Sequence, residues 1–267
     1  LNRFDPETAA YNLPFMVRLT GKVDARALSQ AFGDVVARHE TLRTIYPQVD
    51  ESPQQIILRT EDVFSELQAT SVDEAALMPA LVELAQGGFD VSSEAPFRIE
   101  LFRLTETDHV LAMVLHHIAA DGGSVPILLN DLEIAYAARV RGETPVWAAQ
   151  AVDYADDAAD EDATDVAASQ PFWTRTLAPY VEPVDLPLDH ARSDVPSTSG
   201  QIIETVLPAF LADDIEQFCT THRISRLVFL QIIAALALRA HGGGNRIPMG
   251  TAVDTRPPDA VADAVGL

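Results

Sequence analysis

An apolar run that ends in two adjacent histidines places the tightest constraint on the fold. Residues 109–115 read His-Val-Leu-Ala-Met-Val-Leu, and His116, His117 and the pair Asp121-Gly122 follow. A second apolar stretch at 97–104 precedes this run, and turn-type residues join the two, which predicts two strands of a hairpin. Because an imidazole has a pKa of about 6.5, the chain must place a proton-exchanging pair where a strand gives way to a loop.

Strand and helix signals alternate along the rest of the chain. Alternating apolar residues and β-type composition predict strands at 13–19, 41–46, 54–58, 201–207 and 247–253. Apolar residues at helical spacing, with capping and stop residues, predict helices at 24–40, 72–86, 124–141, 208–221 and 225–241. Asp24 and Ser124 are the expected N-caps, and Gly142 is the expected stop. This interleaving predicts an α/β or α+β class.

Composition excludes several classes of function. The 267 residues are 48% hydrophobic, enough for one large domain or two small ones. A formal net charge of −22 opposes binding to nucleic acid and to anionic membranes. The single cysteine, Cys219, excludes an internal disulfide and is interpreted as a structural thiol. With no apolar run of membrane length and no opening signal peptide, a cytoplasmic protein is expected.

The middle of the chain has a different character. Seven acidic residues crowd an alanine-rich stretch at 153–165, and four prolines follow between 179 and 196. Such composition is typical of a solvated linker or helix face and then an extended crossover. We therefore predict a first subdomain at 1–150, a crossover linker at 151–200 and the start of a second subdomain at 201–267.

The histidine motif and three further segments resemble one known family. Residues 116–122, His-His-Ile-Ala-Ala-Asp-Gly, resemble the His-His-x-x-x-Asp-Gly motif of condensation domains of nonribosomal peptide synthetases. Residues 38–44, Arg-His-Glu-Thr-Leu-Arg-Thr, resemble the second motif of that family. Residues 150–156 are similar to the fourth motif without its tryptophan, and residues 250–256 to the fifth, with Ala252 in the proline position. These matches occur in the family's order and cover nearly the whole chain.

The resemblance implies a fold and an activity. The implied fold is the chloramphenicol acetyltransferase-like two-layer α/β sandwich, with a complete N-terminal subdomain and the beginning of a similar second one. Because the family's first motif and final segments are missing, we expect a fragment that is a poor catalyst or inactive alone. The implied reaction joins a donor acyl or peptidyl thioester to an acceptor aminoacyl thioester. No cofactor is expected to bind directly, because phosphopantetheine arms of donor and acceptor carrier proteins deliver both substrates beside a neighbouring adenylation domain.

The resemblance also assigns roles to motif residues. His117 corresponds to the catalytic histidine, acting either as general base or as a hydrogen-bonding group for the attacking amine. His116 is expected to be a buried, hydrogen-bonded residue pointing the other way, since strand side chains alternate. Asp121 is expected to form a structural ion pair with Arg256 rather than to act in catalysis.

Three further residues receive supporting roles. The backbone of Gly122 and Gly123 is expected to approach the substrate arm. Arg43 is expected to form a structural salt bridge rather than to contact substrate.

Several alternatives are weighed against condensation. A Ser-His-Asp triad through Ser124 is rejected, because Ser124 is better used as a helix cap. A zinc site at the histidine pair is disfavoured, because adjacent strand residues diverge and no further ligand follows, so no metal is expected. A heterocyclisation domain would carry Asp in place of the histidines. An epimerisation domain, a stand-alone acyltransferase and a non-catalytic recruiting module stay open, as does a preference for a D-configured donor residue.

Overall fold

The computed structural model describes residues 8–50, 52–151, 163–180, 186–191, 203–251 and 264–266. The chain forms two compact units, one made of Leu1–Glu161 with Asp254–Leu267 and one made of Asp162–Val253. The first unit therefore contains the histidine motif together with the last residues of the chain. The domain boundaries at 150 and 200 stay predictions.

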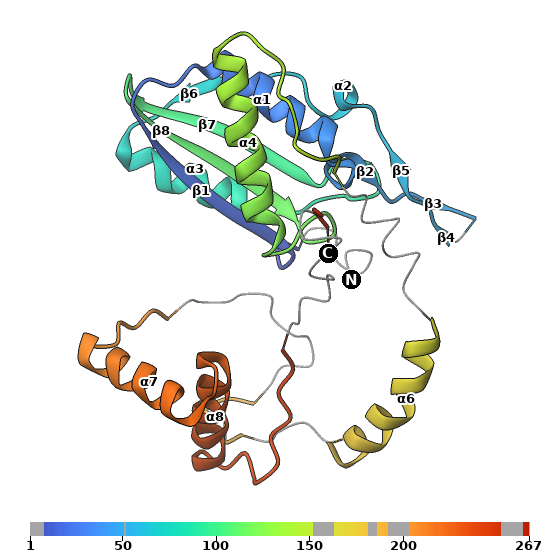
Figure 1. The fold of residues 1–267 in the computed structure, drawn as a ribbon, viewed down its shortest axis with the longest axis vertical. Helices are drawn as coiled ribbons and strands as arrows, with labels where there is room; N and C mark the ends of the chain where they lie inside the picture. The colour runs from blue at the N-terminus through green and yellow to red at the C-terminus, as the bar shows by residue number, and fades with distance from the viewer. Residues whose placement is uncertain are drawn as a thin grey trace. The chain divides into compact units, whose positions relative to one another are not determined.

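The first unit is built on a four-stranded sheet with the order β1-β8-β7-β6 (Figure 1). The predicted hairpin is confirmed as β7 (Phe97–Thr105) and β8 (Asp108–His116), which pair antiparallel. The predicted N-terminal strand is β1 (Asn12–Thr20), which pairs antiparallel with β8. The short strand β6 (Ala69–Ser71) runs parallel to β7 at the other edge. The strand that leads into the histidines is thus an inner strand of the sheet.

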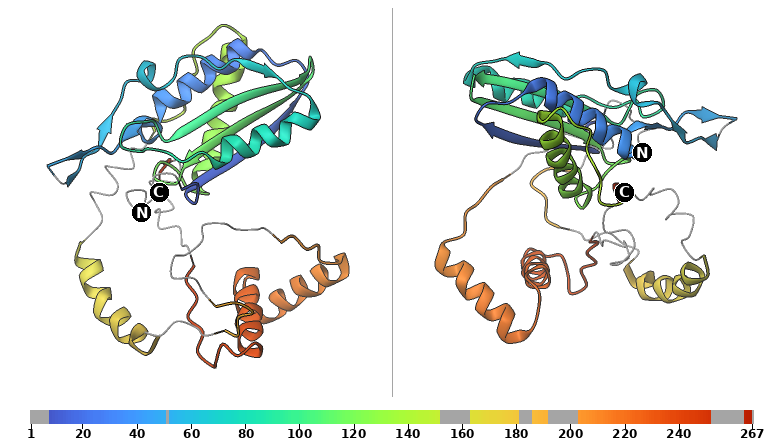
Figure 2. Two further views of the ribbon diagram at one scale, coloured as in Figure 1. Left: turned by 180° about the vertical axis from the view of Figure 1, so that it is seen from behind. Right: turned by 45° about the horizontal axis from the view of Figure 1, so that its top comes forward.

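Burial on both faces of β8 explains why its sequence is continuously apolar rather than alternating. Leu111 and Met113 pack into the main core with residues of α1 (Ala25–Arg38) and α4 (Ser124–Val140). Ala112 packs on the opposite face against α3 (Glu74–Gln86). The views from behind and from the tilted top show α1 and α4 on one side of the sheet and α3 on the other (Figure 2).

The predicted helix starts and stops are largely confirmed. The Asp24 carboxylate accepts the N–H of Ala27 at 2.9 Å, and the Asp73 carboxylate accepts that of Ala76 at 2.8 Å. Gly142 follows α4 with a φ of 74°, a left-handed conformation that favours glycine. The first helix ends at Arg38 rather than Glu40, because His39 has extended dihedral angles and residues Glu40–Arg43 form the 3₁₀ helix η1.

Short elements connect α1 to β6. The strands expected at 41–46 and 54–58 shrink to the pair β2 (Thr44–Ile45) and β5 (Ile56–Ile57), because η1 uses the first residues of the segment. Between them lie β3 (Gln48–Val49) and β4 (Ser52–Pro53), which pair with each other, and α2 (Thr60–Val63) follows.

The second unit is helical in its described part. Its elements are α6 (Ala163–Leu177), η2 (Ala178–Tyr180), α7 (Ala209–His222) and α8 (Arg226–Ala240). The two predicted C-terminal helices are confirmed, with Ser225 capping α8 through the N–H of Val228 at 3.2 Å. Cys219 is buried on α7. Across the residues that the structure covers, no helix is long and apolar enough to cross a membrane.

The strands expected at 201–207 and 247–253 are wrong for the residues that are described. Residues 203–207 and 247–251 have no regular secondary structure. A strand is stabilised by hydrogen bonds to a neighbouring strand, and no described residue pairs with either segment. β-type composition alone does not supply that partner.

Candidate active site

The histidine pair is anchored where β8 ends. The backbone N–H of His116 donates to the carbonyl of Pro96 at 2.9 Å, and that of His117 donates to the carbonyl of Tyr11 at 2.8 Å. Pro96 immediately precedes β7 and Tyr11 immediately precedes β1. Both neighbouring strands therefore hold the backbone from which the two imidazoles project.

His116 is part of the protein interior. Its side chain lies between the rings of Tyr11 and Phe89, with centroids 6.0 and 5.9 Å away. Nδ1 accepts the N–H of Ile118 at 3.1 Å, which places the proton of the neutral ring on Nε2. Burial, and then the nearby charge of His117, lowers the pKa of His116. His116 is thus a neutral residue that shapes the turn after β8.

His117 has a different environment. Its ring is half-buried, and its Nδ1 is buried without a hydrogen-bond partner among the described residues. An unpaired buried polar atom costs about 1–3 kcal/mol, and such atoms in native proteins call for a functional or solvent-based explanation. His116 likewise has a buried ring nitrogen, Nε2, without a partner among the described residues, so the two histidines differ in exposure: His116 is buried, whereas the His117 side chain is half-buried and can still be reached by a substrate.

Gly123, not Ser124, is the N-cap residue of helix α4, and Asp121 binds the first helical residue, Ser124. The Asp121 Oδ1 atom accepts the N–H of Ser124 at 2.9 Å and its hydroxyl at 2.7 Å. Ser124 is the first helical residue and is fully buried, so the prediction that Ser124 is the N-cap is wrong. The reason is local, because the helix already includes Ser124 and its hydroxyl donates to the Asp121 carboxylate instead of accepting an N–H further along the helix. Full burial also removes Ser124 from consideration as a nucleophile.

The structure bears to different degrees on the predictions for Arg256, for the glycines at 122 and 123, and for a metal site. Arg256 lies outside the described residues, so its ion pair with Asp121 stays a prediction. A Cβ at Gly122 would meet no atom within 4 Å, and neither Gly122 nor Gly123 has a positive φ. Neither observation gives a reason within the protein for glycine at 122, and the close approach of a substrate arm stays a prediction. Among the residues with described positions, no group of three side chains could hold a metal ion.

The second motif contributes a buried polar cluster. Arg38 Nε and His39 Nε2 both lie 2.8 Å from Oδ2 of Asp131 on α4. Burial would raise the pKa of Asp131, but hydrogen bonds from His39 and Arg38 and the charge of Arg38 outweigh it and lower the pKa. The ionised carboxylate thus ties α1 to α4.

Sequence reasoning missed Asp131, although a signal was present. Asp131 stands between Leu128, Leu132 and Ala135, at the spacing of one buried helix face. A carboxylate in such a stripe needs a buried cation or donor, and the Arg-His pair of the second motif supplies it.

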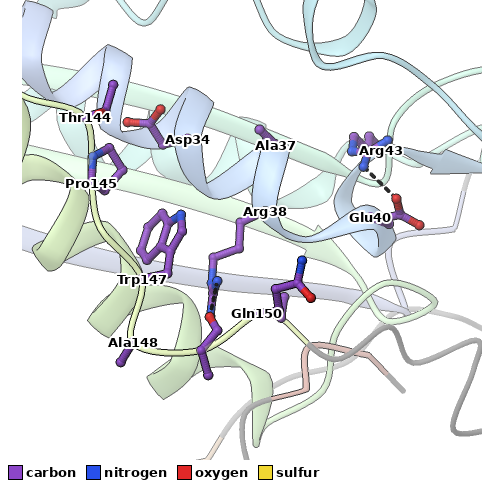
Figure 3. Close-up of a pocket in the computed structure, with 12 residues that line it drawn as sticks. Asp34, Ala37, Arg38, Glu40, Arg43, Thr144, Pro145, Trp147, Ala148 and Gln150 are labelled. Atoms are coloured by element: carbon purple, nitrogen blue, oxygen red, sulfur yellow. Dashed lines mark hydrogen bonds and ion pairs between the residues drawn. The ribbon is translucent and has the colours of Figure 1, made fainter.

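A cleft of about 760 Å³ lies beside this cluster (Figure 3). Arg38 reaches across it to the carbonyl of Ala149 at 2.9 Å and lies 4.6 Å from the ring centroid of Trp147. Arg43 donates to Glu40 at 2.9 Å and to the carbonyl of Leu58 at 2.9 Å. Both guanidinium groups therefore hold protein groups in place, and neither histidine of the motif lines this cleft.

Comparison with known proteins agrees with this arrangement. The family model of the condensation domain matches residues 1–267. A dimodular nonribosomal peptide synthase of Bacillus subtilis (strain 168) is 36% identical over 276 residues, covering 100% of this chain and 12% of that protein. The X-domain from teicoplanin biosynthesis, solved in complex with OxyB, is 32% identical with a TM-score of 0.77, covering 91% of this chain and 55% of the other. The first condensation domain of the CDA synthetase is 19% identical with a TM-score of 0.73, covering 91% and 59%.

A layered α/β unit with two histidines at the end of an inner strand defines the class as a chloramphenicol acetyltransferase-like fold. The chain belongs to the condensation-domain family, whose members occur in nonribosomal peptide synthetases. It spans 12% of the length of the Bacillus relative and little more than half of the two solved structures.

Proposed function

We propose that this chain takes part in amide bond formation during nonribosomal peptide synthesis. The α-amine of an acceptor aminoacyl thioester attacks the carbonyl carbon of a donor acyl or peptidyl thioester. The tetrahedral adduct collapses with loss of the donor thiolate, and the amine loses one proton. The phosphopantetheine arms of two carrier proteins present the substrates, and an adenylation domain loads the acceptor.

The observation that carries this proposal is that the His117 side chain is more exposed than that of His116. The His117 side chain is half-buried at the end of β8, whereas the neighbouring His116 is buried and accepts the N–H of Ile118. A half-buried imidazole in this setting can accept a hydrogen bond or a proton from an attacking amine. General base and positioning group both remain roles for His117.

The surrounding residues support direct transfer between the two thioesters. Ser124 is fully buried, and the carboxylate of Asp121 holds the start of α4. Neither residue therefore completes a Ser-His-Asp relay with His117. Alignment of two bound substrates, which can supply several orders of magnitude in rate, would then carry much of the acceleration.

The test measures the mass of the product formed from loaded donor and acceptor carrier proteins. The reaction uses the native protein that contains this chain, its His117→Ala variant and, as a control, His190→Ala, whose side chain is exposed in the second unit. We expect the native protein and the control to form the amide, and His117→Ala to lose about 10²–10⁴-fold in rate. An unchanged rate in His117→Ala would refute the assignment. Exchange of the α-hydrogen with deuterium in place of amide formation would indicate epimerisation.

A second candidate function is a recruiting module, and the likeness to the X-domain favours it. That domain was solved in complex with OxyB, and it matches this chain at 32% identity. A recruiting module would bind a partner protein with an affinity that His117→Ala leaves unchanged. Calorimetric titration with the partner, alongside the mass assay, separates the two functions.

A further inference from the structure

A short segment from the end of the chain is built into the core of the first unit. Ala264 and Val265 are 0% and 2% exposed, and Val265 packs with the main hydrophobic cluster between the sheet, α1 and α4. The hydroxyl of Thr41 donates to the carbonyl of Val265 at 3.3 Å. The chain therefore returns from the second unit and docks between η1 and the start of α4.

Ser124 joins this segment to the histidine motif. A hydroxyl has one proton and two acceptor lone pairs. The proton goes to Asp121 Oδ1 at 2.7 Å, because a bond to a carboxylate is stronger than one to a neutral carbonyl. The same oxygen accepts the N–H of Asp121 at 3.2 Å and that of Gly266 at 3.2 Å, and the carbonyl of Gly266 lies 3.0 Å away. The fully buried Ser124 side chain thus contacts both Asp121 of the motif loop and Gly266 of the segment 264–266.

The geometry confines the loop that follows the catalytic candidate. Only three residues separate His117 from Asp121, and two of them, Ala119 and Ala120, are fully buried. Ala119 donates its N–H to the carbonyl of His116 at 3.0 Å, and Ile118 donates to the His116 ring. Because the loop is tied to β8 at one end, a fixed Asp121 at the other end leaves His117 little freedom.

From these contacts we infer that Ser124 is a positioning residue for the histidine motif. It acts through Asp121 and the backbone of Gly266 and has no exposed surface for contact with substrate. The docked segment 264–266 completes the site, so that loss of the Ser124 hydroxyl loosens the loop and displaces the His117 imidazole. This inference rests on the proposed function of His117 for its kinetic part only.

The experiment compares Ser124→Ala with Ser29→Ala in the native protein. Ser29 is also buried, and its hydroxyl accepts the N–H of Leu67 at 2.8 Å, so its loss removes a similar hydrogen bond away from the motif. We expect Ser124→Ala to lower kcat about 10–100-fold with little change in KM, because small misplacement of a catalytic group has effects of this size. Ser29→Ala should retain kcat although it also loses a buried hydrogen bond and lowers the melting temperature. Equal kcat losses in the two variants would overturn the inference.

A second readout does not depend on activity. In protein labelled at the histidine rings, the NMR signal of His117, assigned with His117→Ala, should shift in Ser124→Ala and stay in Ser29→Ala. Amide hydrogens of residues 118–123 and 264–266 should exchange faster only in Ser124→Ala. An unmoved His117 signal with unchanged exchange would refute the positioning role. If the native protein forms no amide but these signals change as expected, the proposed function fails and the positioning role stands.

Discussion

Removal of the Asp131 carboxylate should lower the stability of the first unit more than removal of any exposed ion-pair carboxylate among the described residues. Asp131 is 5% exposed, and its Oδ2 accepts hydrogen bonds from Arg38 and His39, whose side chains are 10% and 2% exposed. Asp131→Ala leaves a buried guanidinium and a buried imidazole without their acceptor. Breaking a buried pair in this way costs about 3–5 kcal/mol. Asp131→Asn keeps an acceptor oxygen, so its cost should be about 1–3 kcal/mol.

Urea unfolding followed by tryptophan fluorescence measures this effect. Trp147 packs on Arg38 in the first unit, whereas Trp173 is 52% exposed in the second, so the change in emission reports mainly on the first unit. Asp34→Ala is the matched control, because Asp34 forms another α1–α4 ion pair, with Arg139, at a more exposed position. Asp34→Ala should lower the free energy of unfolding by less than Asp131→Ala does.

The pH dependence gives a second check on Asp131. Its folded pKa is lowered, so the stabilisation is present in full above the unfolded pKa of about 3.9 and is lost as the pH falls through the folded pKa. The stability difference between the native protein and Asp131→Asn should therefore persist at about pH 5–7, where proteins are usually most stable. It should shrink in stronger acid. If Asp131→Ala and Asp34→Ala unfold at the same urea concentration, the reasoning about burial is refuted.

Three further predictions concern His116 and Gly122 of the motif and Gly142 at the end of α4. Because burial lowers the pKa of His116, the unfolded chain binds a proton that the folded chain does not as the pH falls below about 6.5, so stability should decrease in that direction. His116→Asn, which keeps an acceptor for the N–H of Ile118, should flatten this decrease in urea midpoints, and an unchanged slope would contradict the assignment. Gly122→Ala should leave the urea midpoint unchanged, since its Cβ meets no atom within 4 Å, but lower kcat/KM at least about tenfold if substrate approaches this backbone. Gly142→Ala, at a φ of 74°, should show the opposite pattern, with stability lower by about 1 kcal/mol and full activity.

Local sequence signals predicted the elements that position the site. The hairpin of β7 and β8 and the cap at Asp24 appear where the pattern of apolar and capping residues places them. These features depend on side chains that lie close together in the sequence, so the local sequence pattern is sufficient to predict them. The same reasoning failed for the described residues 203–207 and 247–251, where a strand needs a distant partner.

By itself, the sequence determined the class of fold, the histidine pair at the end of a strand, and the family to which the chain belongs. Only the tertiary structure decided that Asp131 receives Arg38 and His39. It also decided that Ser124 meets Gly266, 142 positions later in the chain. A buried polar group must find a partner wherever the packed chain brings one, and separation along the sequence does not reveal which partner that is.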